Sequence, residues 1–322
     1  MNAEFIIAAI VTIVNVTTPI LLAATGELVV EKSGVLNLGI EGMMLVGAIA
    51  GFAVTFEISN NPGLADAAPW LVGAAPWLGV LAAAAAGAAV SMIFGVLVLS
   101  LGSNQVATGL ALTIFGTGLS TLIGESYVGM AGQSFDSIFP DAWAEDPIGK
   151  LFFGYSPLVY IAFIAVFAVY WFLNRTRAGL VLRAVGENDV SARSIGYSVV
   201  GVRYGAIAFG GAMSGVAGSY FTLVSNSLWQ PGMTAGRGWI ALALVVFAGW
   251  RSGRLLAGAY FFGLFMTLEL YAKASGFSFL PSQFWAAMPY LMAIIVLAVM
   301  SARASGGAEA PACLGKTYMP DA

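Results

Sequence analysis

Long apolar runs alternate with short polar segments along almost the whole chain. Because about 20 apolar residues in a helix cross the hydrocarbon core of a bilayer, each run predicts one membrane-spanning helix. The runs lack the period-two alternation of barrel strands, which also favours helices. We expect an all-α, polytopic transmembrane helix bundle of about nine spans, with a range of eight to ten because the seventh run is short. The spans are expected near 5–25, 35–56, 78–100, 104–124, 151–173, 203–224, 238–250, 255–273 and 284–302.

Composition agrees with this interpretation and excludes several kinds of site. Apolar residues make up 59% of the 322 residues and charged residues only 9%, which is far outside the range of soluble domains. The chain has no histidine and one cysteine, Cys313. We therefore expect no catalytic residue and no metal site. A GxxxxGK[ST] phosphate-binding loop is also missing, so energy for uphill transport would come from a partner or an ion.

The basic residues are concentrated between the fifth and sixth predicted spans. Five of the nine arginines lie between 175 and 203, and basic residues that flank spans mark the cytoplasmic side of a membrane. This orientation places ten of the thirteen basic residues inside, with the N-terminus outside and the C-terminus inside. We therefore expect a membrane domain at 1–302 with a cytoplasmic loop at 174–203, and a polar cytoplasmic tail at 303–322.

The cytoplasmic loop contains a segment with the pattern of a short helix. After Arg183 it reads AVGENDVSARSIG, in which Asn188 or Asp189 can cap a helix of about two turns and Gly196 can end it. A solvated loop whose arginines only set the topology is the alternative, but it does not explain the small residues. These small residues predict a surface that fits a cleft in another protein, and they are Ser191, Ala192 and Gly196, with Arg183 and Arg193 at the rim.

Four segments together resemble the permease subunits of bacterial ABC importers, in the branch that serves branched-chain amino acids, simple sugars and nucleosides. They are TPILLAATGELVVEKSGVLNLGIEGMMLVGA (18–48), GSNQVATGLALTIFGTGLS (102–120), RAVGENDVSARSIG (183–196) and GRGWIALALVVFAGW (236–250). The second segment is more similar to the simple-sugar and nucleoside members. The resemblance covers roughly residues 15–300 and leaves the tail from Ser301 unmatched.

This resemblance implies a permease subunit in the inner (cytoplasmic) membrane that forms half of a translocation pathway and is not an enzyme. It implies a coupling helix that docks on a cytoplasmic ABC ATPase, which binds ATP and magnesium, so that the permease binds no cofactor. A sister permease, identical or different, and a substrate-binding protein are further implied partners, and nucleic acid is not. Nucleosides are the first expected substrate class and simple sugars the second. The implied ATPase contacts are Arg183, Gly186, Glu187, Asn188, Ser191, Ala192, Arg193 and Gly196.

Polar residues inside the predicted spans are candidates for the pathway or its gate. A carboxylate at membrane depth costs several kcal/mol unless it is protonated, paired or hydrated, which makes Glu41 a functional candidate. Packing at a cytoplasmic gate and direct contact with substrate both stay open for it. Amides at the start of the fourth span can bind a sugar or base, or can cap the helix. The candidate pathway or gate residues are Asn37, Glu41, Asn104, Gln105 and Thr108.

Two further features bear on the pathway. Pro19 lies inside the first predicted span and removes one helix hydrogen bond, which predicts either a break that lines a cavity or a simple kink. The segment 225–238 is expected to be an outer loop that meets the binding protein. Its Trp229 and Trp239 fit an interfacial aromatic belt equally well.

Two other function classes have weaker support. An ion-coupled secondary transporter needs paired central charges and inverted repeats, and the sequence shows neither apart from Glu41. An intramembrane hydrolase needs a histidine, a buried cysteine or paired catalytic carboxylates. The permease interpretation is therefore the one that the sequence favours.

Overall fold

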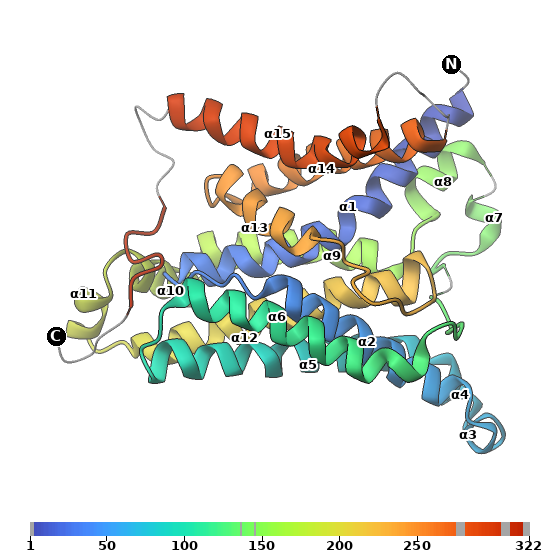
Figure 1. Cartoon of the computed structure of the whole chain (residues 1–322), viewed down its shortest axis with the longest axis horizontal. Helices are drawn as coiled ribbons and strands as arrows, with labels where there is room; N and C mark the ends of the chain where they lie inside the picture. The colour runs from blue at the N-terminus through green and yellow to red at the C-terminus, as the bar shows by residue number, and fades with distance from the viewer. Residues whose placement is uncertain (1–2, 136, 145, 275–280, 304–309, 318–322) are drawn as a thin grey trace.

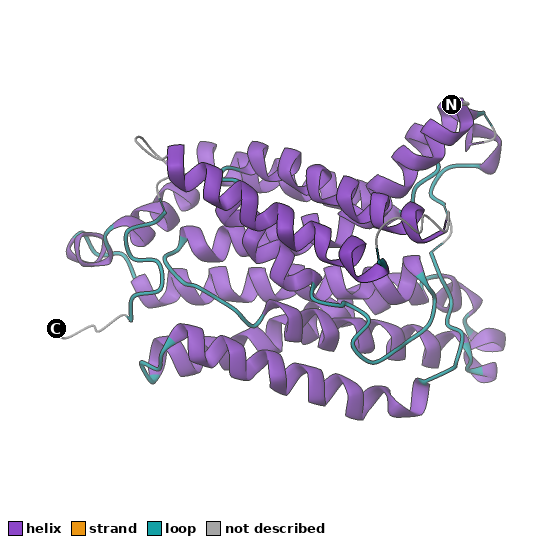
Figure 2. Cartoon of the chain, turned by 45° about the horizontal axis from the view of Figure 1, so that its top comes forward, coloured by secondary structure: helices purple, strands orange, loops and turns teal. Residues whose placement is uncertain are grey.

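The computed structural model describes residues 3–317, apart from 136, 145, 275–280 and 304–309. All regular elements in this part of the chain are helices (Figure 2). Extended pairing among these residues is limited to two isolated bridges, Val128 with Trp229 and Ala131 with Leu228. Seven helices of the described chain are long and apolar enough to cross a membrane. The expectation of an all-α, polytopic bundle is confirmed.

The long helices follow the predicted apolar runs. The seven candidate spans are built from α1 (Ala3–Lys32), α2 (Ile40–Ser59), α5 (Ala75–Gly95) with the π-helical η1 (Val96–Ser100), α6 (Gln105–Gly124), α9 (Pro157–Arg175), α12 (Val199–Tyr220) with the π-helical η3 (Phe221–Ser225), and α14 (Ser252–Ala274). Two further elements in the apolar runs are α13 (Arg237–Phe247) and α15 (Ser282–Arg303). The connecting helices are α3 (Pro62–Ala67), α4 (Pro69–Gly73), η2 (Glu125–Tyr127), α7 (Asp141–Ala144), α8 (Pro147–Phe153), α10 (Arg177–Glu187) and α11 (Asp189–Ser194).

Two predicted spans need correction, and one of the two alternatives for Pro19 is excluded. The run at 151–173 is divided, because α8 ends before Gly154 and α9 begins with Pro157 at its first position. The run at 238–250 forms only the 11-residue α13, which is about 16 Å long and too short to cross a bilayer alone. Pro19 does not break α1, which continues as one helix to Lys32. Loss of a single backbone hydrogen bond is evidently tolerated in a helix that packs along most of its length.

The bundle has two distinct ends (Figure 1). At one end lie α10, α11 and the C-terminal segment 310–317, and we name it the α11 end. At the other lie α3, α4, α7, α8 and the start of α1, and we name it the α7 end. The arginine-rich loop therefore lies at the same end as the described C-terminal segment and opposite to the start of α1.

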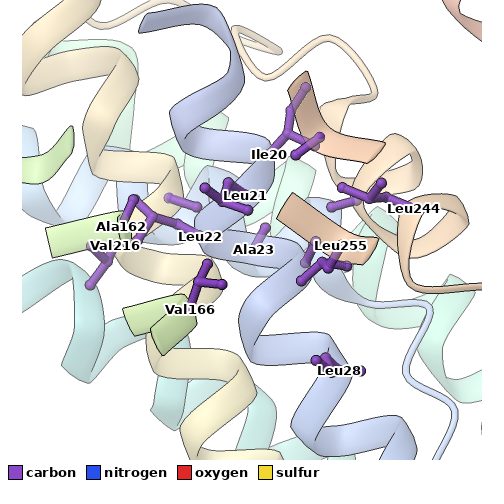
Figure 3. Close-up of a cluster of buried hydrophobic side chains, with 14 of the residues drawn as sticks. Ile20, Leu21, Leu22, Ala23, Leu28, Ala162, Val166, Val216, Leu244 and Leu255 are labelled. Atoms are coloured by element: carbon purple, nitrogen blue, oxygen red, sulfur yellow. The ribbon is translucent and has the colours of Figure 1, made fainter. Parts of the chain in front are cut away.

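The core is built around α1 and α12. Apolar side chains of α1 contact α9, α12, α13 and α14, and Figure 3 shows Leu22 of α1 close to Ala162 and Val216. On its other sides α12 packs against α2 and α5 at glycines. A Cβ on Gly218 would overlap the backbone oxygen of Met44, so these helices touch backbone to backbone. Helix α12 thus runs through the centre of the molecule from one end towards the other.

Candidate functional site

The short helix predicted in the cytoplasmic loop is α11. The Asn188 side chain accepts a hydrogen bond from the Ser191 N–H at 2.9 Å and so caps its first turn. Gly196, with a φ of 92°, follows in the left-handed region. The predicted cap and end are therefore confirmed. The helix has six residues, which is close to the predicted two turns. Asn188 is extended and separates it from α10.

Two of the predicted contact residues are buried in the chain itself. Ala192 is only 2% exposed and packs between Val185 and Val199. Gly186 is buried as well, and a Cβ there would overlap the Lys32 backbone oxygen at the end of α1. The prediction of Ala192 on the outer surface is therefore wrong, since its small size serves internal packing. The other predicted residues are half-buried (Arg183) or exposed (Glu187, Asn188, Ser191, Arg193 and Gly196).

The exposed surface of α11 and its following turn is apolar at three positions that the sequence analysis did not select. Val190 is 69% exposed, Ile195 72% and Tyr197 45%. Arg193 is exposed on the same short helix. Apolar side chains in a polar, water-exposed loop are typical of a surface that another protein covers. The sequence could have indicated this surface, because Val190, Ile195 and Tyr197 are apolar or aromatic residues in an otherwise polar loop.

An ion pair between the buried Arg203 and the partly exposed Asp189 holds α11 to the bundle. Arg203, near the start of α12, is 0% exposed, and its Nη2 donates to Asp189 Oδ2 of α11 at 3.2 Å. Its Nε donates to the Ser33 backbone oxygen, just after α1, at 3.1 Å. Removing one member of a buried ion pair costs about 3–5 kcal/mol. One guanidinium therefore joins α11, α12 and the end of α1.

The C-terminal segment packs on the same end of the molecule. The Cys313 N–H donates to the Gly186 oxygen at 2.9 Å, and the Gln105 side-chain Nε2 donates to the Lys316 oxygen at 2.9 Å. Gln105 Oε1 also accepts the Leu36 N–H at 2.7 Å. Gln105 is 2% exposed, so its amide connects the tail and the α1–α2 loop.

The neighbouring polar candidates form local hydrogen bonds. Asn104 caps α6 by accepting the Ala107 N–H at 3.0 Å, and Thr108 donates to Ser103 Oγ at 3.2 Å. Asn37 is 1% exposed and accepts the Gly39 N–H at 2.9 Å before α2 begins. These three side chains shape the backbone at the α11 end of α2 and α6.

Glu41 joins two helices that are far apart in sequence. Its carboxylate is in the first turn of α2 and accepts three hydrogen bonds from the segment that leads into α13. Oε1 accepts from Thr234 Oγ1 at 2.6 Å and from the Gly236 N–H at 2.7 Å, while Oε2 accepts from the Gly238 N–H at 2.6 Å. The carboxylate thus caps the N-terminus of α13, where the helix dipole also favours negative charge.

The segment between η3 and α13 is exposed at several positions but anchors two side chains inside the protein. Thr234 and Trp229 are both 0% exposed, and Trp229 packs in a cluster with Phe52. The interpretation of Trp229 as an interfacial belt residue is therefore wrong. At the far end of α13 the Trp250 indole N–H donates to Glu31 of α1 at 2.5 Å, so this short helix is fixed at both ends.

Comparison with known proteins gives a consistent set of relatives. Residues 9–299 match the family described as "Branched-chain amino acid transport system / permease component". The chain is 42% identical over 266 residues to a Haloferax volcanii protein that is named as a glucose ABC transporter permease, covering 81% of this chain and 76% of that one. It is 30% identical over 309 residues to a Bacillus subtilis guanosine ABC transporter permease, covering 94% and 93%. Identity to a Lactococcus lactis nucleoside ABC transporter permease is 28% over 311 residues, covering 94% of each. No solved structure matches the chain.

Proposed function

Because this chain belongs to the family of branched-chain amino acid transport system permease components, we propose that it forms one half of the translocation pathway of an ABC importer. It is a multi-pass permease subunit of the cell's inner membrane and not an enzyme. A sister permease, identical or different, forms the other half, and a substrate-binding protein delivers the solute. ATP and magnesium bind to a separate cytoplasmic ATPase, so this chain holds no cofactor.

We propose that the solute is a simple sugar or a nucleoside. The relative with 42% identity is named for glucose, and the two relatives that align over 94% of this chain are named for guanosine and for nucleosides. These solutes share an uncharged ring with several hydroxyl groups. The names of these relatives support an uncharged solute with several hydroxyl groups, and they do not distinguish a sugar from a nucleoside.

We propose nine membrane crossings. Seven long helices provide seven of them, and α15 provides one more. The ninth consists of α13, which covers about half of the hydrocarbon thickness, together with the non-helical segment that precedes it. Helix α1 begins at the α7 end and the described C-terminal segment lies at the α11 end (Figure 1), which supports an odd number of crossings.

We propose that α11 and the turn after it dock in a groove of the ATPase. The observation that carries this proposal is the exposure of Val190, Ile195 and Tyr197 on a helix that Arg203 holds rigidly to the bundle. Apolar side chains supply the contact area, and the exposed Arg193 supplies charge at its rim. A displacement of α11 by the ATPase is then transmitted through Arg203 to α12 and to the end of α1.

The test replaces Ile195 with aspartate in an affinity-tagged permease that is expressed together with its ATPase. Placing a charge where an apolar side chain is expected to be buried should weaken the complex by about 2 kcal/mol or more, roughly 30-fold. The amount of ATPase that copurifies measures the effect. Leu101→Asp is the matched control, because Leu101 is 70% exposed and lies beyond η1 outside the loop.

Both variants should fold, since neither side chain is buried, and size-exclusion chromatography checks this. Loss of ATPase with Ile195→Asp but not with Leu101→Asp supports docking through α11. Equal recovery of the ATPase with both variants contradicts it. Ala192 is unsuitable for this purpose, because a larger residue there disturbs the contact with Val185 and Val199.

A further inference from the structure

A polar cavity of about 500 Å³ lies among α1, the start of α9, the end of α12 with η3, and the segment that leads into α13. This volume is within the range of small-molecule sites, about 300–1,000 Å³. Its position towards the N-terminal half of α1 and the end of α12 places it on the α7 side of the bundle, away from α11. Polar side chains that line it are Asn15, Ser156, Tyr220, Ser225, Asn226 and Arg237.

The backbone around this cavity is irregular. Helix α12 ends in the π-helical turn η3, which supplies Phe221, Val224 and Ser225 to the wall. The segment 226–236 that follows is not α-helical, and it supplies Asn226 and Met233. Irregular backbone at membrane depth is tolerated where it is buried in protein or lines a water-filled cavity, and π-helical turns are frequent at functional sites. The wall therefore has the features of a built site rather than of a packing defect.

The side chains of the cavity are held in position by one another. The Tyr220 hydroxyl donates to Asn15 Oδ1 at 3.1 Å, which leaves the NH2 group of Asn15 as a donor for another partner. Arg237 lies over the Phe221 ring at 4.9 Å from its centroid, and its Nη1 donates to the Met233 oxygen at 3.4 Å. Groups that are already held in position lose little conformational entropy when a ligand binds.

The chemistry of the lining selects the class of ligand. Among the described residues, those that line the cavity include no carboxylate, so these residues give the wall no anionic side chain to bind a cation. The one cationic group, Arg237, lies between Gly236 and Gly238, whose N–H groups bind the Glu41 carboxylate. The local charges therefore largely offset each other, which disfavours a phosphorylated solute. Amide and hydroxyl groups that both donate and accept hydrogen bonds match a ring with several hydroxyls.

We propose that this cavity is a binding subsite for the polyhydroxylated ring of an uncharged solute, either a pyranose or the ribose of a nucleoside. This inference rests on the proposed function, because it places the transported solute in one permease half. It differs from the sequence-based expectation, since Asn37, Glu41, Asn104, Gln105 and Thr108 are not among the lining residues. A binding protein docked at the α7 end would release the solute into this part of the pathway first.

The experiment measures solute protection of a thiol in the cavity. Val224→Cys places a thiol in the wall without removing a polar group, in a chain whose single native cysteine, Cys313, is replaced by alanine. A membrane-impermeant maleimide labels the assembled transporter from the α7 end. At a solute concentration about ten times its dissociation constant, labelling should slow about tenfold. Val128→Cys is the matched control, because Val128 is 53% exposed and does not line the cavity.

Three solutes separate the possible outcomes. Protection of Val224→Cys by D-glucose assigns a pyranose, and protection by guanosine assigns a nucleoside. Protection only by L-leucine, equal protection of Val128→Cys, or no protection by any of the three overturns the proposal. Copurification of the ATPase is measured on the same samples. If the ATPase copurifies but no solute protects the thiol, the subsite is wrong and the proposed permease function stands. If a solute protects the thiol but no ATPase copurifies, the subsite stands and the proposed permease function is wrong.

A second variant tests the named hydrogen-bonding group. Asn15→Leu removes the amide, and the loss of one neutral hydrogen bond should raise the solute concentration for half-protection about fivefold. Thr12→Val in the same helix is the control, because Thr12 does not line the cavity and donates only within α1, to the Ala8 oxygen. Ser225→Ala repeats the test if Asn15→Leu fails to fold. An unchanged half-protection concentration in the folded variant contradicts the assignment.

Discussion

Glu41 offers the sharpest test of what holds the cavity-lining segment before α13 in place. The perturbation is Glu41→Gln, which keeps the shape of the side chain and removes its charge. In the structure all three donors, Thr234, Gly236 and Gly238, direct hydrogens at the carboxylate, and the residue is only 7% exposed. A glutamine amide has one oxygen and one NH2 group, so it cannot accept from both directions.

The expected loss follows from this geometry. In its better orientation glutamine keeps the two bonds at the Oε1 position and directs its NH2 at the Gly238 N–H, which leaves that buried donor unsatisfied at a cost of about 1–3 kcal/mol. The two remaining bonds change from charge-assisted to neutral, at about 1 kcal/mol each. We expect a total of about 3–5 kcal/mol, which corresponds to a fall in Tm on the order of 10 °C.

The assay is thermal unfolding of the purified permease in detergent, followed by intrinsic tryptophan fluorescence. Glu57→Gln is the matched control, because Glu57 lies in the same helix, is exposed, and accepts one hydrogen bond, from the Tyr127 hydroxyl at 2.9 Å. It should lower Tm far less, since water replaces the lost charge interaction. A loss for Glu41→Gln no larger than that of the control would contradict this reasoning. The proposed charge-assisted cap would then be refuted.

Two further predictions concern the ion pair and the glycine contacts. Arg203→Met should destabilise the protein by at most about 3–5 kcal/mol, the cost for a fully buried pair, because it leaves the partly exposed Asp189 carboxylate without this partner. Adding Asp189→Leu should recover much of the loss. Tm measures both effects, and no recovery in the double variant contradicts the pairing. Gly218→Ala should cost more than about 3 kcal/mol, because its Cβ would overlap the Met44 backbone oxygen. Gly118→Ala meets no atom within 4 Å and should be neutral or slightly stabilising, which the yield and Tm of folded protein will show.

Features that depend on a few neighbouring residues could be predicted from the sequence. The apolar runs gave the order of the helices, and the caps at Asn104 and Asn188 follow from side chains that bond three residues ahead. The length of α13 was not predictable in this way. Its start is set by Gly236 in the left-handed region and by the Glu41 carboxylate, and Glu41 is 195 residues away from Gly236.

The candidate site was predictable in its location but not in its contacts. The sequence identified the loop that carries α11, yet it assigned Ala192 to the outer surface, because a small residue fits equally well against a partner and against its own chain. Arg203 looked like one of several topology-setting arginines, and its partners lie 14 and 170 residues away. Only the fold brings Ser33 and Asp189 together at its guanidinium.

The arrangement of α1 and α12 connects the two proposed sites. Helix α12 has Arg203 near its start and Tyr220 at its end, about 25 Å apart along the helix. Helix α1 ends at Lys32, beside the Ser33 oxygen that Arg203 binds, and carries Asn15 in the cavity wall. Both helices therefore contact the α11 end and also line the cavity. Under the proposed function, a push on α11 would alter the cavity through two of its walls. By thermodynamic reciprocity, a solute that favours one shape of the cavity would then favour one position of α11.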